Sequence, residues 1–168
     1  MIAMRSSGPR LTTLLTSHGS ASQSYPGLQF LVFKRNTQGR ALYVVVATKE
    51  NAFTSATLRA SGKPTILAQA GIHSGEIEGQ DAGLMLLRDI AFGGKEALLD
   101  HANLLFIPIF NVDGHELRSE WNQPNQRGPV HQGWRATAQS LNLNRDYVKA
   151  DAPEMCALLR LLNLWRPR

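Results

Sequence analysis

Apolar residues fall into short runs separated by polar turns along this chain, a pattern that predicts a sheet combined with a few helices. Four runs, each of six to eight residues, are too short for typical helices and are rich in Val, Ile, Leu and Phe, so we predict strands. They lie at residues 28–34, 41–48, 65–70 and 104–109. Asn36 to Gly39 is a turn signal, so the first two runs should form a hairpin. Pro108 indicates a strand end or an edge strand.

Two longer segments show the three-to-four-residue spacing of amphipathic helices. Residues 79–92 are the first, and their apolar positions are Leu84, Met85, Leu86, Leu87, Ile90 and Ala91, with Asp81 and Arg88 on the wet face. Gly93 and Gly94 should end this helix. Residues 97–100 follow as a candidate helical turn.

A last helix is expected to start near residue 151 and to run to about Trp165. Asp151 is the candidate N-cap, Pro153 fits the first turn, and Glu154 would complete a capping box. Its predicted core-facing stripe consists of Met155, Leu158, Leu159 and Leu162.

We predict loops for the remaining segments. Residues 1–27 are rich in Ser, Thr, Gly and Pro, with at most a helical turn at 11–15, and residues 49–62 read as a polar connection. Residues 111–114 read as a turn. The polar stretch 116–144 is unusually long for an irregular segment of a compact domain, which favours a functional loop. The whole pattern predicts one α/β domain or part of a larger one.

Composition narrows the function classes. The 168 residues are 43% hydrophobic and 18% charged, so a packed core is expected. The net charge of +5 is scattered along the chain and does not favour nucleic-acid binding. Cys156 is the only cysteine, so no internal disulfide can form. No stretch is long enough to span a membrane, and the N-terminus lacks a signal-peptide core, so the default expectation is a cytoplasmic protein.

The strand at residues 65–70 is followed by the segment His73-Ser74-Gly75-Glu76, just before the first helix. The end of a buried strand in an α/β sheet is where ligands usually bind. Imidazole nitrogen and carboxylate oxygen are two of the ligand types that zinc accepts. His73 and Glu76 are therefore candidate metal ligands. The structural alternative is a hydrogen-bonded turn histidine beside a helix-capping glutamate.

A second group of candidate residues lies late in the long polar stretch. Trp134-Arg135 is followed by Asn142-Leu143-Asn144-Arg145. A guanidinium group can bind a carboxylate through two parallel hydrogen bonds. Each arginine taken alone would equally suit a solvated loop.

Taken together, these residues resemble a known family. His73-Ser74-Gly75-Glu76, Asn111-Val112-Asp113-Gly114-His115-Glu116, Trp134-Arg135 and Asn144-Arg145 occur in the order and rough spacing found in zinc metallocarboxypeptidases of the carboxypeptidase A-like superfamily. The resemblance runs from about residue 39 to 168 and corresponds to the N-terminal half of such an enzyme. It implies an α/β fold with a mixed, twisted sheet and helices on both faces, truncated at the C-terminus.

The resemblance also implies roles. His73 and Glu76 would bind one Zn²⁺, Arg135 would polarise the scissile carbonyl, and Asn144 with Arg145 would hold the C-terminal carboxylate of a peptide or protein substrate. The third zinc ligand and the general-base glutamate would lie beyond residue 168. Asn142 stands where many relatives carry the Asp that accepts a hydrogen bond from the ligand histidine. Nothing in the spacing favours His18, His101, His115 or His131 as a substitute ligand.

Two other functions stay open at this point. One is a zinc amidohydrolase that deacylates N-acyl amino acids, and the other is a non-catalytic carboxylate-binding remnant of the same fold. With only two nameable ligands, the chain is expected to bind zinc poorly and to be inactive alone. An unpaired sheet edge would also promote self-association. No nucleic-acid or membrane partner is expected.

Overall fold

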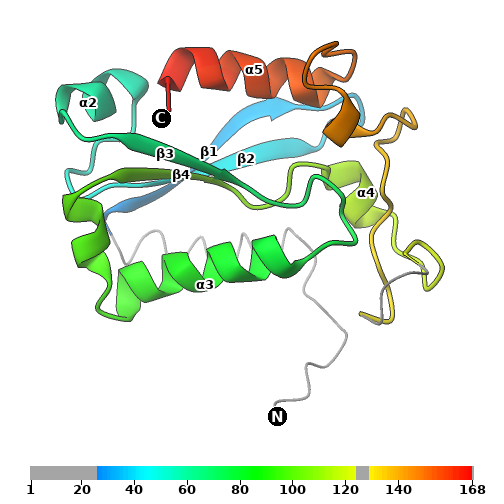
Figure 1. The fold of residues 1–168 in the computed structure, drawn as a ribbon, viewed down its shortest axis with the longest axis horizontal. Coiled ribbons are helices and arrows are strands. Elements are labelled where there is room, and N and C mark those ends of the chain that lie inside the picture. Colours follow the sequence, from blue (N-terminus) through cyan, green and yellow to red (C-terminus); the bar gives the residue numbers. More distant parts are fainter. Residues whose placement is uncertain (1–25, 124–128, 168) are drawn as a thin grey trace.

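A computed structural model describes residues 26–123 and 129–167, which form a four-stranded mixed sheet between helices (Figure 1). The strands are β1 (Leu28–Arg35), β2 (Ala41–Ala47), β3 (Thr65–Gln69) and β4 (Asn103–Ile107), in the spatial order β1-β2-β4-β3. The pairs β1–β2 and β2–β4 are antiparallel, whereas β3 and β4 are parallel. The four strands predicted from the sequence are confirmed, with ends that differ by one or two residues.

The predicted hairpin between β1 and β2 is present. Its turn is closed by the Asn36 side chain, whose Oδ1 accepts hydrogen bonds from the backbone N–H groups of Gln38 (3.0 Å) and Arg40 (2.9 Å). Gly39 adopts φ +76°, a conformation that glycine reaches without strain. The Arg40 guanidinium then reaches Asp113 Oδ1 at 2.6 Å, which ties the hairpin to the segment after β4.

Strand β4 lies inside the sheet and is buried on both faces. Leu105 and Ile107 face one apolar cluster and Phe106 faces another, as the two-residue period of a strand requires. Pro108 follows the last residue of β4, so its prediction as a strand end is confirmed. A central strand of this kind fixes where the chain leaves the sheet, and the candidate residues follow at that end.

Helix α3 (Glu78–Phe92) covers one face of the sheet (Figure 1). Gly83 lies directly against the Phe106 ring, because a Cβ there would sit 2.0 Å from Phe106 Cζ. Leu87 and Ile90 are buried as predicted, but Met85 and Leu86 are exposed, so their assignment to the apolar face is wrong. The buried stripe is narrower than the sequence suggests: Leu87 and Ile90 pack in one core cluster with Phe106 of β4 and Leu99 of the 3-10 helix η1 (Glu96–Asp100).

Helix α5 (Pro153–Trp165) and the short α2 (Ser55–Ala60) cover the opposite face (Figure 1). The residues of α5 that enter the core are Met155, Leu158, Leu161 and Trp165. Leu159 is 36% exposed and Leu162 only partly buried, so the predicted stripe is rotated by about one position at its C-terminal half.

The predicted capping box of α5 is also wrong. The N-cap is Ala152, and Asp151 caps nothing with its side chain. The Asp146 carboxylate instead accepts hydrogen bonds from the backbone N–H groups of Asp151 (3.0 Å) and Ala152 (2.8 Å). Glu154 is buried, and burial raises the pKa of its carboxyl group.

Two segments assigned to loops contain helices. Residues 49–62 include α2, whose N-cap Thr54 forms a capping box with Thr57. Residues 111–114 are the start of α4 (Val112–Glu116) rather than an isolated turn. The predicted helical turn at 97–100 is confirmed within η1, and the one at 11–15 lies outside the described residues. Among the described residues, no helix is long and apolar enough to cross a membrane.

Candidate metal site and carboxylate-binding loop

The first candidate element is the histidine turn, residues 71–76, which joins β3 to α3. The chain leaves β3 through Gly71, whose φ is +62° and whose Cβ, if present, would lie 3.1 Å from Ile109 Cα. Glycine is therefore needed for both its conformation and its close approach. The Glu76 backbone N–H donates to His73 O at 3.0 Å, which folds the turn so that both side chains point the same way. His73 is 3% exposed, and the Glu76 side chain is 43% exposed.

The hydrogen bonds of Asn142 determine which ring nitrogen of His73 carries a proton. Asn142 Oδ1 accepts the Asn144 backbone N–H at 3.0 Å, so the orientation of this amide is fixed. The same oxygen lies 3.0 Å from His73 Nε2. Since an amide oxygen can only accept, Nε2 must donate. The neutral His73 ring therefore has its lone pair on Nδ1.

His73 Nδ1 faces Glu76 Oε1 across 3.1 Å. In the neutral ring both atoms carry lone pairs, an arrangement that a shared cation would stabilise. Two atoms that each lie about 2.0–2.1 Å from a tetrahedral zinc are roughly 3.3 Å apart, close to the observed separation. The chemistry and the spacing of these two atoms thus fit a zinc site. Among residues 26–123 and 129–167, no group of three His, Cys, Asp or Glu side chains is placed to hold a metal.

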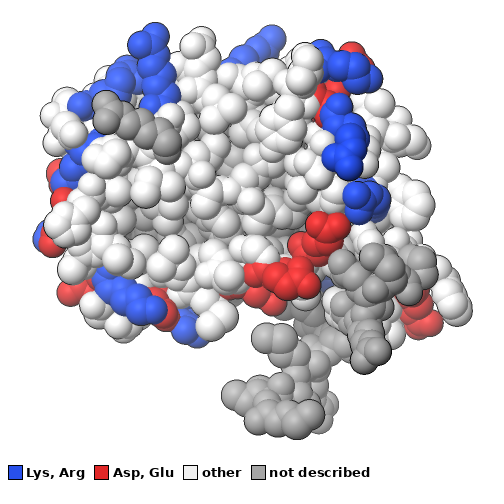
Figure 2. Space-filling view, in the orientation of Figure 1, with Lys and Arg blue, Asp and Glu red and all other residues white. Residues whose placement is uncertain are grey.

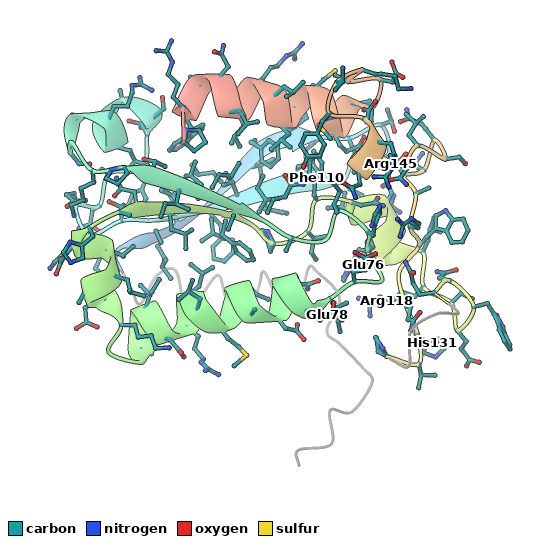
Figure 3. All side chains as sticks on the ribbon, viewed as in Figure 1. Glu76, Glu78, Phe110, Arg118, His131 and Arg145 are labelled. Atoms are coloured by element: carbon teal, nitrogen blue, oxygen red, sulfur yellow. The ribbon has the colours of Figure 1, made fainter. Side chains whose placement is uncertain are left out.

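The other histidines in the described residues do not approach this pair. His115 accepts a hydrogen bond at Nε2 from Arg118 Nη2 (2.8 Å), and burial together with the Arg118 charge lowers its pKa from 6.5 to about 4. His131 is exposed and lies well apart from Glu76 (Figure 3). His101 is exposed at the end of η1. His18 lies outside the described residues.

The second element is the arginine loop, residues 133–137. Arg135 Nη1 donates to Glu76 Oε1 at 3.2 Å, so the loop brings its guanidinium to the oxygen that also faces His73. Gly133 packs on the histidine turn, because a Cβ there would lie 2.6 Å from Ser74 Cβ and 2.7 Å from Ser74 O. Residues 59 apart in sequence are thus brought together, as the candidate site requires.

Asn144 and Arg145 follow in the 3-10 helix η2 (Leu143–Arg145), whose N-cap is Asn142. Both side chains are exposed, and Arg145 Nη1 donates only to the neighbouring Asn144 carbonyl at 2.9 Å. Arg145 therefore makes no ion pair among the described residues and remains available to an anion. In Figure 3, Glu76 and Arg118 are labelled near the start of α3, and Arg145 lies on the same side of the view but nearer the start of α5.

Acidic and basic side chains gather at different places on this face. Figure 2 shows one group of acidic side chains at the end where α3 begins and, beyond it, a column made mostly of Lys and Arg side chains, with some acidic atoms near its top. In the same orientation, Glu76 and Glu78 are labelled in the acidic region and Arg145 is labelled in the basic region (Figure 3). An anionic ligand oriented by both groups would place its negative end toward Arg145.

Sequence reasoning missed the residues that hold these elements together. Asn111 and Ser74 were recognised only as members of motifs, without roles, and Arg118 was not singled out. Asn111 is buried, but its burial is known only from the folded chain, so no sequence signal pointed to its role.

Comparisons with known proteins identify the family and the fold. The zinc carboxypeptidase family model matches residues 19–157, beginning earlier than the resemblance found in the sequence. No curated protein sequence matches significantly. A metallo-carboxypeptidase from Burkholderia cenocepacia superposes with a TM-score of 0.67 at 20% identity, covering 91% of this chain and 37% of that structure.

Two further solved structures show the same fold. Thrombin activatable fibrinolysis inhibitor superposes with a TM-score of 0.67 at 16% identity, and the match covers 91% of this chain and 43% of that structure. A metallo-carboxypeptidase from Pseudomonas aeruginosa, in complex with (2-guanidinoethylmercapto)succinic acid, has a TM-score of 0.60 at 18% identity, covering 88% of this chain and 35% of its own. The chain thus spans less than half of each of these three structures. With its family model covering most of the sequence, the chain belongs to the zinc carboxypeptidase family.

Proposed function

We propose that this chain provides part of the active site of a zinc-dependent carboxypeptidase that hydrolyses C-terminal peptide bonds. In this proposal His73 and Glu76 bind one Zn²⁺, Arg135 is the catalytic cation, and Asn144 and Arg145 bind the substrate carboxylate. The observation that carries it is the His73 ring, which is held by Asn142 at Nε2 and presents Nδ1 to Glu76 Oε1. The remaining zinc ligand is expected from residues beyond this chain.

Each residue has a separable task. A bound zinc would lower the pKa of its water toward ~7 and so supply hydroxide at neutral pH. Asn142 keeps the proton of His73 on Nε2 and so leaves Nδ1 free to act as a ligand. Arg135, at 3.2 Å from Glu76, lies where it can stabilise negative charge that develops on a carbonyl oxygen beside the metal. Losing one such donor typically costs about 10²–10³ in rate.

Arg145 would make the enzyme an exopeptidase. An internal peptide bond offers no carboxylate to an exposed guanidinium, whereas a peptide C-terminus does. Charge-assisted hydrogen bonds of this kind contribute about 1.5–3 kcal/mol, which corresponds to roughly 10–100-fold in affinity. The carboxylate preference can therefore be measured as binding, without any turnover by this chain.

The test is an NMR titration of the 168-residue protein with an acetylated tripeptide as the free acid and as the C-terminal amide. We expect the free acid to bind about tenfold more tightly or better, and Arg145→Ala to abolish the difference. Arg160→Ala, an exposed arginine on α5, is the matched control and should preserve it. Equal binding of the free acid and the amide by the unmodified protein would contradict the proposal that Arg145 binds the substrate carboxylate. An N-acetyl amino acid that binds as tightly as the tripeptide would favour an N-acyl amino acid deacylase instead.

The proposal includes self-association through β3. Within the described residues β3 pairs only with β4, so its other edge has no strand partner. It carries no charged residue, and Ile66 is 47% exposed. The opposite edge strand, β1, has a register shift between Val32 and Lys34, and such irregularities and charges discourage edge pairing.

Analytical ultracentrifugation tests this surface. The unmodified protein should form dimers or larger species that Ile66→Lys weakens, because an edge lysine opposes strand pairing. Val32→Lys, at a 50% exposed position on β1, should leave the association unchanged. A monomer at all concentrations would refute the proposed association.

A further inference from the structure

Asn111 contacts both elements of the candidate site. It follows β4, serves as the N-cap of α4, and is 1% exposed. Its Oδ1 accepts the Gly114 backbone N–H at 3.0 Å, so the orientation of the amide is fixed. Its Nδ2 therefore points to the arginine loop, where it donates to the carbonyls of Arg135 (3.2 Å) and Ala136 (3.0 Å).

The backbone of the same residue holds the histidine turn. The Asn111 N–H donates to Gly71 O at 2.8 Å, and Ser74 Oγ donates to Asn111 O at 2.6 Å. The contacts are thus divided: the main chain of Asn111 binds the turn that carries His73 and Glu76, and its side chain binds the loop that carries Arg135. A side-chain substitution can release one without touching the other.

Burial indicates which contact contributes more to the position of the arginine loop. The side chains of the Arg135–Glu76 pair are 44% and 43% exposed, and ion pairs that are this exposed contribute little to stability. The Asn111 amide is 1% exposed and makes two hydrogen bonds to the loop backbone, and hydrogen bonds from a group shielded from water are stronger than contacts between exposed charges. The Asn111 amide therefore contributes more than the ion pair to the position of the loop, together with the Trp134 N–H bond to Gly114 O and the packing of Gly133 on Ser74.

We propose that Asn111 is a positioning residue for Arg135: its side-chain amide sets the distance between the catalytic guanidinium and the zinc ligands. This inference rests on the proposed function for the meaning of that distance, but the positioning itself can be measured without zinc or substrate. The competing role is a simple helix cap for α4, which uses only Oδ1.

Asn111→Ser and Asn111→Ala separate these two roles. Serine is itself a good N-cap, so it can keep the acceptor for α4 while it removes the donor to the arginine loop. Alanine removes both. The protein is labelled with ¹⁵N, and two signals are followed: amide exchange at Trp134, which donates to Gly114 O at 2.7 Å, and the Arg135 guanidinium resonance with its hydrogen bond to Glu76.

We expect Asn111→Ser to resemble Asn111→Ala: Trp134 exchange should accelerate about tenfold or more, and the hydrogen bond from Arg135 to Glu76 should disappear. Circular dichroism should show a folded Asn111→Ser protein, since the cap is kept. An Asn111→Ser protein that keeps the unmodified exchange rate and Arg135 signal would overturn the proposal and leave Asn111 as a helix cap.

Zinc titration of the same variants separates this inference from the proposed function. The affinity of His73 and Glu76 for zinc should not fall in Asn111→Ser, because the backbone contacts to Gly71 and Ser74 remain and the lost Arg135 hydrogen bond competes with a metal for Glu76 Oε1. Only weak zinc binding is expected from two ligands, so the titration is carried to a large excess of Zn²⁺. If His73 of the unmodified protein showed no response even then, the proposed function would fail, while the exchange data would still decide the positioning role. A large decrease of zinc affinity in Asn111→Ser would contradict the division of contacts.

Discussion

The histidine turn and the arginine loop meet at Glu76 but are built in opposite ways. The turn places His73 and Glu76 three residues apart between a strand and a helix, and local backbone geometry aims both side chains. The loop belongs to an irregular stretch, and Asn111 and Gly114 hold it from elsewhere in the chain. Distant residues, Asn111 and Asn142, also hold the turn, but the hydrogen bond that aims its two side chains is local, whereas the loop reaches Glu76 through long-range hydrogen bonds. The two elements should therefore respond differently to the same perturbation.

Lowering the pH should produce the largest difference in stability between the two elements. The arginine loop rests on α4, where burial and Arg118 lower the pKa of His115 from 6.5 to about 4. Because the folded pKa lies below the unfolded one, folding releases a proton, and stability is lost as the pH falls from 6.5 toward 4. The loss is on the order of 3 kcal/mol and is complete below the folded pKa.

Urea denaturation between pH 7 and 4 measures this loss. His115→Gln cannot titrate, so its free energy of unfolding should fall less between pH 7 and 4 than that of the unmodified protein. His101→Gln, an exposed histidine, is the matched control and should keep the whole slope. Amide exchange should report earlier opening at Trp134 than in β4. An unmodified protein with the same stability at pH 7 and 4 would show that His115 is not held neutral.

Gly133→Ala should have the next largest effect, because it forces apart the two elements themselves. The new Cβ would meet Ser74 O at 2.7 Å, and such overpacking costs about 1–3 kcal/mol. The control is Gly79→Ala, in α3. Its new Cβ would lie 3.4 Å from Ala70 Cβ, which is an ordinary contact, so this substitution should leave the stability unchanged or raise it. Thermal melts of both variants decide this, and equal melting temperatures would show that Gly133 does not pack as tightly as described.

The same contrast explains what the sequence could predict. The hairpin, β3, β4 and α3 follow from apolar period and turn residues, which are local signals. The cap of α5 does not, because the acceptor is Asp146, several residues before the helix, rather than Asp151. Helix α4 was missed because five residues carry too little periodicity to stand out from a turn.

For the candidate site the division is similar. His73 and Glu76 could be named from the strand–turn–helix pattern alone. Arg135, Asn144 and Arg145 needed a family resemblance, since nothing local distinguishes them from solvated loop residues. The hydrogen bond between Asn142 and His73 spans 69 residues and was expected only through the family resemblance. The link from Asn111 to Arg135 spans 24 residues and was not expected at all, because nothing in the spacing indicates it.

The central claim is that His73 is preorganised as a metal ligand, with its proton on Nε2 and its lone pair on Nδ1. The most direct test is a ¹⁵N–¹H correlation spectrum of the histidine ring nitrogens, recorded before and after addition of Zn²⁺. We expect an Nε2–H tautomer for His73, and a zinc-dependent shift at Nδ1 that precedes any change at His101 or His131 and is weakened in Glu76→Gln. An Nδ1–H tautomer, or a His73 ring that does not respond to zinc before the exposed histidines do, would contradict the account.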